Sequence, residues 1–148
     1  MYDSINLVRL ETNEDCIIDE ISFLEIHNDT IFVLDKLERS ILLFDLSGNF
    51  INKISVLGSG PQEYKDITSI SIDDNYVYIY DNSLDKVLKY THNGDFVSSH
   101  RLKFFCQKVM PLDDGDMLCY GRGMHNAHLP SIIDYSLWKC DSTYSRIS

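Results

Sequence analysis

Two aspartates occupy the same place in a repeated pattern and are the first candidates for chemistry. Asp35 follows the apolar run Thr30–Leu34, and Asp81 follows the aromatic run Tyr76–Tyr80. Carboxylates at the ends of neighbouring strands could line the mouth of a channel and bind a hard cation such as calcium. Alternatively, each carboxylate caps a turn by accepting backbone N–H groups. Gly121 stands at the third such position, so any acidic ring is incomplete. We therefore expect the capping role and no cofactor, with calcium as the alternative.

A histidine pair lies in an irregular stretch that runs from Gly121 to Pro130. His125 and His128 have the His-x-x-His spacing that can bind a metal on a helical turn, and Asp134 follows nearby. No third ligand stands at a diagnostic distance, so the spacing is more typical of a solvated loop and no metal site is predicted. Loops on a rigid scaffold often carry function. This stretch is therefore the best candidate for ligand contact, through Arg122, His125 and His128, and His92 is a similar candidate elsewhere.

A glycine-rich loop joins the two copies of the repeat. Its sequence is Gly58-Ser-Gly60-Pro61-Gln-Glu63-Tyr64. The glycines permit positive φ and the proline favours a tight turn. The loop lacks the Lys-Ser/Thr of a phosphate-binding loop, so we predict a structural link, with ligand contact as the alternative.

Catalytic signatures are not found. The sequence has no Gly-x-Ser-x-Gly elbow, no His-Glu-x-x-His pair and no carboxylate pair in a catalytic context. No catalytic residue is predicted, and the sequence favours a protein that is not an enzyme.

These residues are positioned by an internal repeat. Residues 21–54 align without a gap on residues 67–100, at an offset of 46 positions. Each copy reads as four short strands separated by turn residues, which is typical of one blade of a β-propeller. Asn93-Gly94 marks a hairpin turn, for which the dipeptide predicts type I′.

A third, degraded copy follows. Its strands are predicted at residues 109–112, 116–120, 136–140 and 143–147, and a further strand is predicted at residues 6–10. The predicted fold is therefore all-β: a single partial propeller domain over residues 1–148, made of three blades of four antiparallel strands. The blades cover about residues 21–55, 67–102 and 105–147, and strand 6–10 is a candidate for closing a blade.

Composition excludes several classes of partner. The chain of 148 residues carries 13 Lys and Arg against 23 Asp and Glu, a net charge of −10, which argues against nucleic acid and anionic membranes. No apolar run is long enough to span a bilayer, and the start shows no signal peptide. The chain is therefore cytoplasmic or begins after a removed leader. Cys16, Cys106, Cys119 and Cys140 form no CxxC pair and are interpreted as small core residues, with a disulfide as an alternative if the protein is exported.

Two segments carry a resemblance to a known family. Residues 44–51 (FDLSGNFI) and the Gly58–Tyr64 loop, together with Leu10-Glu11 and Ile21, resemble the NHL-like six-bladed β-propellers of Gram-negative gut bacteria. The resemblance covers Leu7 to Leu102 well and the remainder loosely. It implies a longer, exported protein, periplasmic or a cell-surface lipoprotein, without an assigned activity.

Three blades do not form a closed propeller by themselves. Three blades would leave two apolar end faces bare, and propellers close with roughly 4–8 blades. We therefore expect a homodimer that completes a six-bladed ring, with residues 6–10 of one chain closing the third blade of the other. Missing blades of a longer chain are the alternative. The predicted function is non-catalytic binding of a ligand or protein. The alternatives are a metal-dependent lyase or hydrolase with its site in the central channel, and a structural domain of a longer protein.

Overall fold

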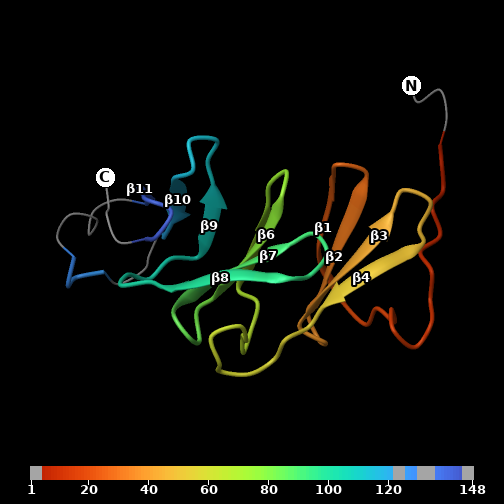
Figure 1. The fold of residues 1–148 in the computed structure, drawn as a ribbon, viewed down its shortest axis with the longest axis horizontal. Coiled ribbons are helices and arrows are strands. Elements are labelled where there is room, and N and C mark those ends of the chain that lie inside the picture. The colour runs from red at the N-terminus through yellow and green to blue at the C-terminus, as the bar shows by residue number, and fades with distance from the viewer. Residues whose placement is uncertain (1–4, 122–125, 130–135, 145–148) are drawn as a thin grey trace. The chain divides into compact units, whose positions relative to one another are not determined.

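The chain folds into antiparallel β-sheets. The computed structural model describes residues 5–121, 126–129 and 136–144, and this part of the chain contains eleven strands and no helix. Figure 1 shows the strands, which form three sheets. Sheet I contains β1 (Ile21–His27), β2 (Thr30–Asp35), β3 (Ser40–Asp45) and β4 (Phe50–Ile54). Sheet II contains β5 (Ser69–Ile72), β6 (Tyr76–Asp81), β7 (Lys86–Thr91) and β8 (Phe96–Arg101). Sheet III contains β9 (Lys108–Pro111), β10 (Met117–Tyr120) and β11 (Leu137–Cys140).

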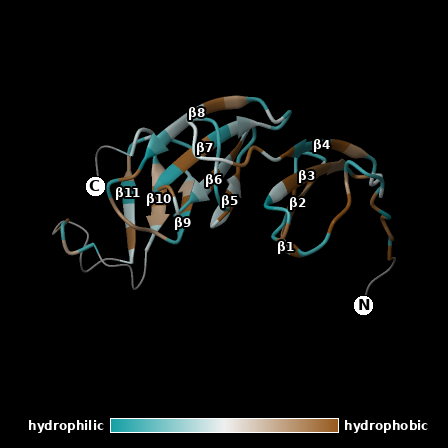
Figure 2. Ribbon diagram, turned by 90° about the horizontal axis from the view of Figure 1, so that it is seen from below, coloured by the Kyte–Doolittle hydropathy of each residue, from teal (hydrophilic) through white to brown (hydrophobic). Residues whose placement is uncertain are grey.

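The all-β class predicted from the sequence is confirmed. In sheets I and II each strand pairs with the next strand of the sequence, and none of the three sheets closes on itself within the described residues. The chain divides into two compact units, residues 1–55 with sheet I and residues 56–148 with sheets II and III. Figure 2 shows that hydrophobic residues lie along the strands and hydrophilic ones in the turns.

The 46-residue repeat extends to irregular details of the backbone. The β3–β4 register shifts between Leu43 and Phe44, and the β7–β8 register shifts between Lys89 and Tyr90. Arg39 and Asp85, which are not glycines, have positive φ angles of 51° and 50° at equivalent points before β3 and β7. A shared β-bulge and a shared left-handed residue indicate one structural unit used twice.

The turn between β7 and β8 differs from the type predicted from the sequence. The type I′ turn expected at Asn93-Gly94 is wrong, because only Gly94 has a positive φ, at 84°. Three residues separate Thr91 from Asp95, and Gly94 N donates to Thr91 O at 2.9 Å. A three-residue loop needs one left-handed residue, whereas type I′ needs two. Two consecutive positive φ angles occur instead at Asn28 (44°) and Asp29 (60°), between β1 and β2.

The first unit builds its core on one face of sheet I. Cys16 is buried there with residues from β2 and β3, and the partly buried side chains of Leu10, Ile18 and Phe50 pack against them. Glu11 fixes the N-terminal segment, since its amide donates to Gly48 O at 2.7 Å and its carboxylate accepts from Phe50 N at 2.8 Å. Residues 10–18 therefore cover part of this sheet.

The predicted strand at residues 6–10 joins none of the three sheets in the described part of this chain. The side chains of residues 6–9 are exposed, Leu7 to 93%, whereas Leu10 is partly buried against the core of sheet I. The expectation concerned pairing with another chain, so it stays a prediction.

The second unit has its core between sheets II and III. Tyr78, Tyr80 and Val87 of sheet II form one buried cluster with Met117 and Trp138 of sheet III. Ser71 Oγ of β5 donates to Val109 O of β9 at 2.7 Å, which ties the two sheets at their first strands.

Sheet III has three strands in the described part of the chain, close to the predicted positions. Of the fourth strand predicted at residues 143–147, Thr143 and Tyr144 lie in a turn and a bend. Residues 145–147 lie outside the described residues.

Gly48 offers a test of the packing between the N-terminal segment and sheet I. It has a φ of 88°, and a Cβ there would lie 2.1 Å from the backbone oxygen of Arg9. Gly115 has nearly the same φ, 83°, with open space around its Cβ position. Gly115→Ala should cost about 1–2 kcal/mol through backbone strain alone. Gly48→Ala should cost at least about 2 kcal/mol more, because backbone must move. Urea unfolding measures both, and equal losses would contradict the close packing.

Candidate functional site

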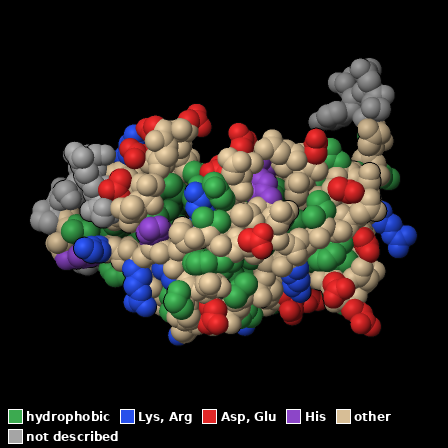
Figure 3. Space-filling view, in the orientation of Figure 1, with side chains coloured by type: hydrophobic (Ala, Val, Ile, Leu, Met, Phe, Trp, Pro, Cys, Tyr) green, Lys and Arg blue, Asp and Glu red, His purple; other side chains and the backbone are tan. Residues whose placement is uncertain are grey.

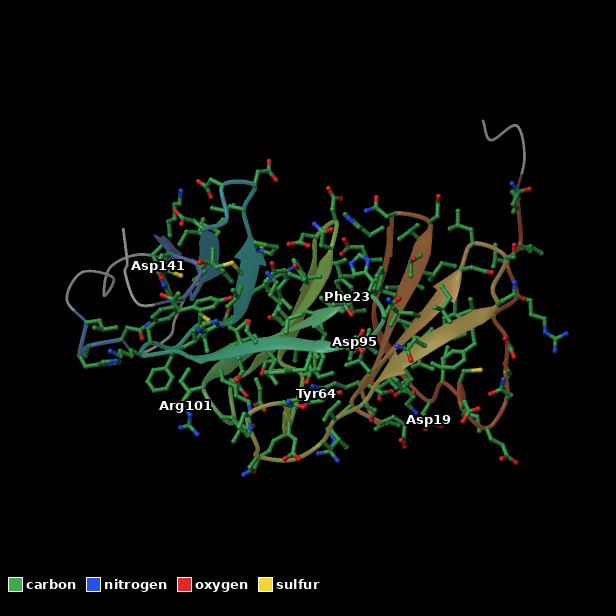
Figure 4. All side chains as sticks on the ribbon, viewed as in Figure 1. Asp19, Phe23, Tyr64, Asp95, Arg101 and Asp141 are labelled. Atoms are coloured by element: carbon green, nitrogen blue, oxygen red, sulfur yellow. The ribbon has the colours of Figure 1, made fainter. Side chains whose placement is uncertain are left out.

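Asp35 lies fully buried at the end of β2, and its carboxylate is surrounded by backbone amides. Oδ2 accepts from Asp19 N at 2.6 Å, and Oδ1 accepts from Glu20, Leu37 and Glu38 N at 3.1–3.3 Å. Burial raises the pKa of Asp35, but the four amides together outweigh it and hold the pKa below its usual value. The carboxylate therefore joins the residues before β1, where Figure 4 labels Asp19, to the β2–β3 turn.

Asp81 repeats the arrangement in sheet II. Its Oδ2 accepts from Lys65 N at 2.6 Å and Asp66 N at 3.4 Å, and its Oδ1 accepts from Ser83 N at 2.8 Å and Leu84 N at 3.2 Å. Each donor lies 46 positions after its counterpart in sheet I. A cation and an amide hydrogen need the same lone pairs, so calcium at either carboxylate would have to displace several N–H donors. Within the described residues, no group of three or more His, Cys, Asp or Glu side chains could hold a metal ion.

Sheet III replaces the aspartate with an asparagine from the irregular stretch. Gly121, the residue after β10, takes the repeat position that Asp35 holds at the end of β2, and a Cβ on Gly121 would lie 2.2 Å from the Trp138 ring. Asn126, 3% exposed, takes over the contact: Oδ1 accepts from Phe105 N at 2.8 Å, and Nδ2 donates to Phe105 O at 2.9 Å.

The backbone pairing shows that this contact is equivalent to those in the other sheets. Gln107 N donates to Tyr120 O as Thr68 N donates to Tyr80 O. Phe105 therefore corresponds to Asp66, whose amide Asp81 accepts. Sequence reasoning missed Asn126, because no aspartate marks its position in the repeat.

The Gly58–Tyr64 loop is closed by its own backbone. Tyr64 N donates to Val56 O at 3.0 Å, and Gly58 N donates to Tyr64 O at 2.9 Å. The Glu63 carboxylate accepts from Gly60 N at 2.8 Å, and a Cβ on Gly58 would lie 2.1 Å from that carboxylate. Tyr64, labelled in Figure 4, is fully buried. This part of the motif is thus a compact structural link.

Two side chains of β7 attach the loop to sheet II. Lys86, 4% exposed, donates from Nζ to Gly60 O at 2.7 Å, and Tyr90 OH donates to Gln62 O at 2.6 Å. Burial lowers the pKa of Lys86, and Asp81 and Glu63 oppose the change. Burial, with the charge of Glu63, raises the pKa of Tyr90 to about 12. Sequence reasoning missed Lys86, because a lysine in a strand is ordinarily exposed to solvent.

Two of the remaining candidates, His92 and His128, lie in the described part of the chain and contact different backbone segments. His128 is exposed, with Nε2 2.8 Å from Lys103 O and its ring 6.0 Å from the Phe105 ring. His92 is half-buried in the β7–β8 turn, with Nε2 3.0 Å from Asp73 O. Arg122 and His125 lie outside the described residues, as does Asp134. Figure 3 shows Asp and Glu side chains spread over the visible face, with Lys and Arg side chains between them.

The family assignment follows from the whole length of the chain. A family described as "Domain of unknown function (DUF4934)" matches residues 1–148. The chain belongs to DUF4934. No curated protein matches this DUF4934 chain.

Solved structures share its fold. A protein from Bacteroides fragilis that is assigned as exported is 28% identical, with a TM-score of 0.81, over 97% of this chain and 40% of that one. A member of the DUF4221 family from Bacteroides vulgatus is 11% identical, with a TM-score of 0.62, over 94% of this chain and 44% of that one. The computationally designed protein Ika4 is 14% identical, with a TM-score of 0.54, over 98% of this chain and 78% of that one.

The DUF4934 chain thus spans less than half the length of the two Bacteroides proteins. The described residues contain no helix able to cross a membrane.

The buried aspartates should be required for stability. Asp35→Asn and Asp81→Asn each place an NH2 group against backbone N–H donors, which should lower the free energy of unfolding by about 1–3 kcal/mol. Asp29→Asn is the matched control, because Asp29 is exposed and asparagine tolerates its positive φ. Urea unfolding measures the losses. If Asp35→Asn behaved like the control, the carboxylate would not hold the sheet.

A pH series separates the charge of Asp35 from its shape. The folded pKa lies below the unfolded value of about 4. The stabilisation is therefore full above that value and is lost as the pH falls through the folded pKa. The difference in unfolding free energy between wild type and Asp35→Asn should stay constant down to about pH 5 and shrink below about pH 4. A difference independent of pH would contradict the role of the charge.

Asn126 should protect the backbone that leads into β9. Asn126→Ala leaves the N–H and C=O of Phe105 without this partner and should cost about 1–3 kcal/mol. His128→Ala, an exposed change in the same stretch, should cost about 0.5 kcal/mol or less. Hydrogen exchange of the Phe105 amide should accelerate in the first variant and stay slow in the second. Unchanged exchange in both variants would contradict the contact.

Proposed function

We propose that this DUF4934 chain forms three blades of a β-propeller and acts as an exported, non-catalytic binding protein. The observation that carries the proposal is the repeated four-stranded sheet with its buried aspartate. Two sheets share strand order, bulge position and the amide contacts of Asp35 and Asp81, and a third sheet follows. Consecutive antiparallel sheets in sequence order are what a propeller requires. The resemblance to NHL-like propellers supports the same reading and stays a prediction.

Uncovered apolar faces support completion by further sheets. Leu24 and Ile26 of β1 lie opposite Val33 and Ile31, on the face that carries the first core, and remain 54% and 60% exposed. On sheet III, Leu137 lies opposite Tyr120 and is 52% exposed. A ring needs roughly 4–8 blades, so two copies of this chain would supply six. The greater length of the B. fragilis protein supports the alternative, in which one longer chain supplies them all.

The use of the polar groups supports the proposal of binding without catalysis. Asp35, Asp81, Asn126 and Lys86 all contact backbone of their own unit. The exposed pair formed by His128, within the irregular stretch, and Phe105 is the surface we propose for contact with a partner. Export is proposed from the B. fragilis relative, which is assigned as exported.

Light scattering on a size-exclusion column tests the ring. A particle of twice the 17.1 kDa chain mass is expected. Ile26→Lys, on the uncovered face, should weaken the dimer at least about tenfold. Leu46→Lys, in an exposed turn, should leave it intact. A folded monomer at all concentrations would overturn completion by a second copy.

A further inference from the structure

Three cysteine thiols meet in the core of the second unit. Cys106, Cys119 and Cys140 are at most 1% exposed and belong to the cluster between sheets II and III. Cys119 Sγ lies 3.5 Å from Cys140 Sγ, and Cys106 lies close enough to raise the pKa of Cys119. Cys119 is therefore in contact with both other thiols, and all three are unbonded thiols here.

Strand register explains why two of them meet. Cys119 lies opposite Trp138 and Cys140 lies opposite Met117 in the β10–β11 pair. Side chains two positions apart along a strand share a face, so the two thiols are diagonal neighbours on the buried face. Diagonal neighbours lie about 7–8 Å apart, just beyond the usual Cα–Cα span of a disulfide, so the bond requires a small shift of the backbone. The two sulfur atoms already lie 3.5 Å apart.

We propose that Cys119 and Cys140 form a disulfide when the chain folds in an oxidising compartment, with Cys106 left as the neighbouring free thiol. Each thiol loses its hydrogen as the S–S bond forms. The two protons and two electrons pass to a disulfide oxidant, a protein or a small molecule, which is reduced to two thiols. The cellular setting rests on the proposed export, because such bonds persist outside the cytosol. The approach of the two sulfur atoms to 3.5 Å does not depend on the proposed export.

Burial of the thiols in the folded core determines the stage of folding at which the disulfide forms. Hydrogen bonds to Cys106 and Cys140, together with burial, raise the pKa of the Cys119 thiol. The thiolate is the reactive species, so the folded, reduced core exchanges slowly. Oxidation therefore belongs to folding, before sheet III closes against sheet II.

The disulfide would constrain the irregular stretch by joining the residues on either side of it. Cys119 and Cys140 flank the segment that supplies Asn126, whose side chain holds the backbone before β9. A cross-link across a loop of about 20 residues lowers the equilibrium constant for unfolding roughly a hundredfold. It would fix both ends of the segment that we propose for partner contact.

Peptide mapping tests the pairing. Unfolded, reduced protein is refolded in a mixture of reduced and oxidised glutathione, then unfolded in urea that contains an alkylating reagent, so that buried free thiols also react, and cut with trypsin. Trypsin separates the three cysteines into peptides 104–108, 109–122 and 140–146. The expected product links peptides 109–122 and 140–146, with peptide 104–108 alkylated. Reduction of the disulfide should lower the urea concentration at the midpoint of unfolding.

The controls make each outcome decisive. Cys16→Ser, in the other unit, and Cys106→Ser should both keep the link, whereas Cys119→Ser should abolish it. A link between peptides 104–108 and 109–122 would overturn the proposed pairing. Full alkylation of Cys119 and Cys140 in the folded, oxidised sample would overturn the disulfide itself. The mapping is done in vitro on the full chain, so failure of the proposed export or of the ring would leave its result unchanged.

Discussion

A buried carboxylate that gathers backbone amides is the constraint on which the sheets depend. Asp35 and Asp81 each reach across their own sheet and hold the residues before its first strand against the turn between its second and third strands. A buried charge is costly unless hydrogen bonds replace water, and here each carboxylate accepts four amides. The same contact fixes where the chain enters each sheet. The first strands begin at different points of the repeat, Ile21 in sheet I and Ser69 in sheet II, but the bulges between the third and fourth strands recur at the offset of 46.

The same constraint occupies several residues whose types often carry out chemistry. Aspartate, lysine and glutamate are residue types that bind cations or move protons, yet Asp35, Asp81, Lys86 and Glu63 contact backbone of their own unit. A group committed to holding the fold cannot be released to a substrate without loss of structure. Ligand contact on such a scaffold falls to exposed side chains at its loops, where variation is tolerated. His128 and Phe105 fit that position.

The sequence was sufficient to predict the strands, which depend on local residue patterns. It was not sufficient to predict contacts between residues that are far apart in the chain. Alternation and turn residues placed the strands, and the offset of 46 placed Asp35 and Asp81 in equivalent positions. The turn at Asn93-Gly94 was wrong, because loop length and not the dipeptide selected the turn type. Asn126 and Lys86 could not be found, since each acts on a segment about 20 residues or more away. The approach of Cys119 to Cys140 likewise depends on the register of β10 and β11.

Sheet III departs from the repeat in three ways. Gly121 leaves room for the Trp138 ring and carries no carboxylate, and the connection from β10 to β11 is longer than those from β2 to β3 and from β6 to β7. The replacement, Asn126, has no charge, and a neutral hydrogen bond is weaker than one to a carboxylate. Its anchor also comes from a long connection, whose ordering costs more entropy than that of a tight turn. β10 and β11 have four residues each, against six in their counterparts β6 and β7, while β9 and β5 both have four. The proposed disulfide joins β10 to β11, in the sheet that lacks the repeated aspartate. By restricting the unfolded chain, the bond would stabilise this sheet in place of the missing carboxylate contacts.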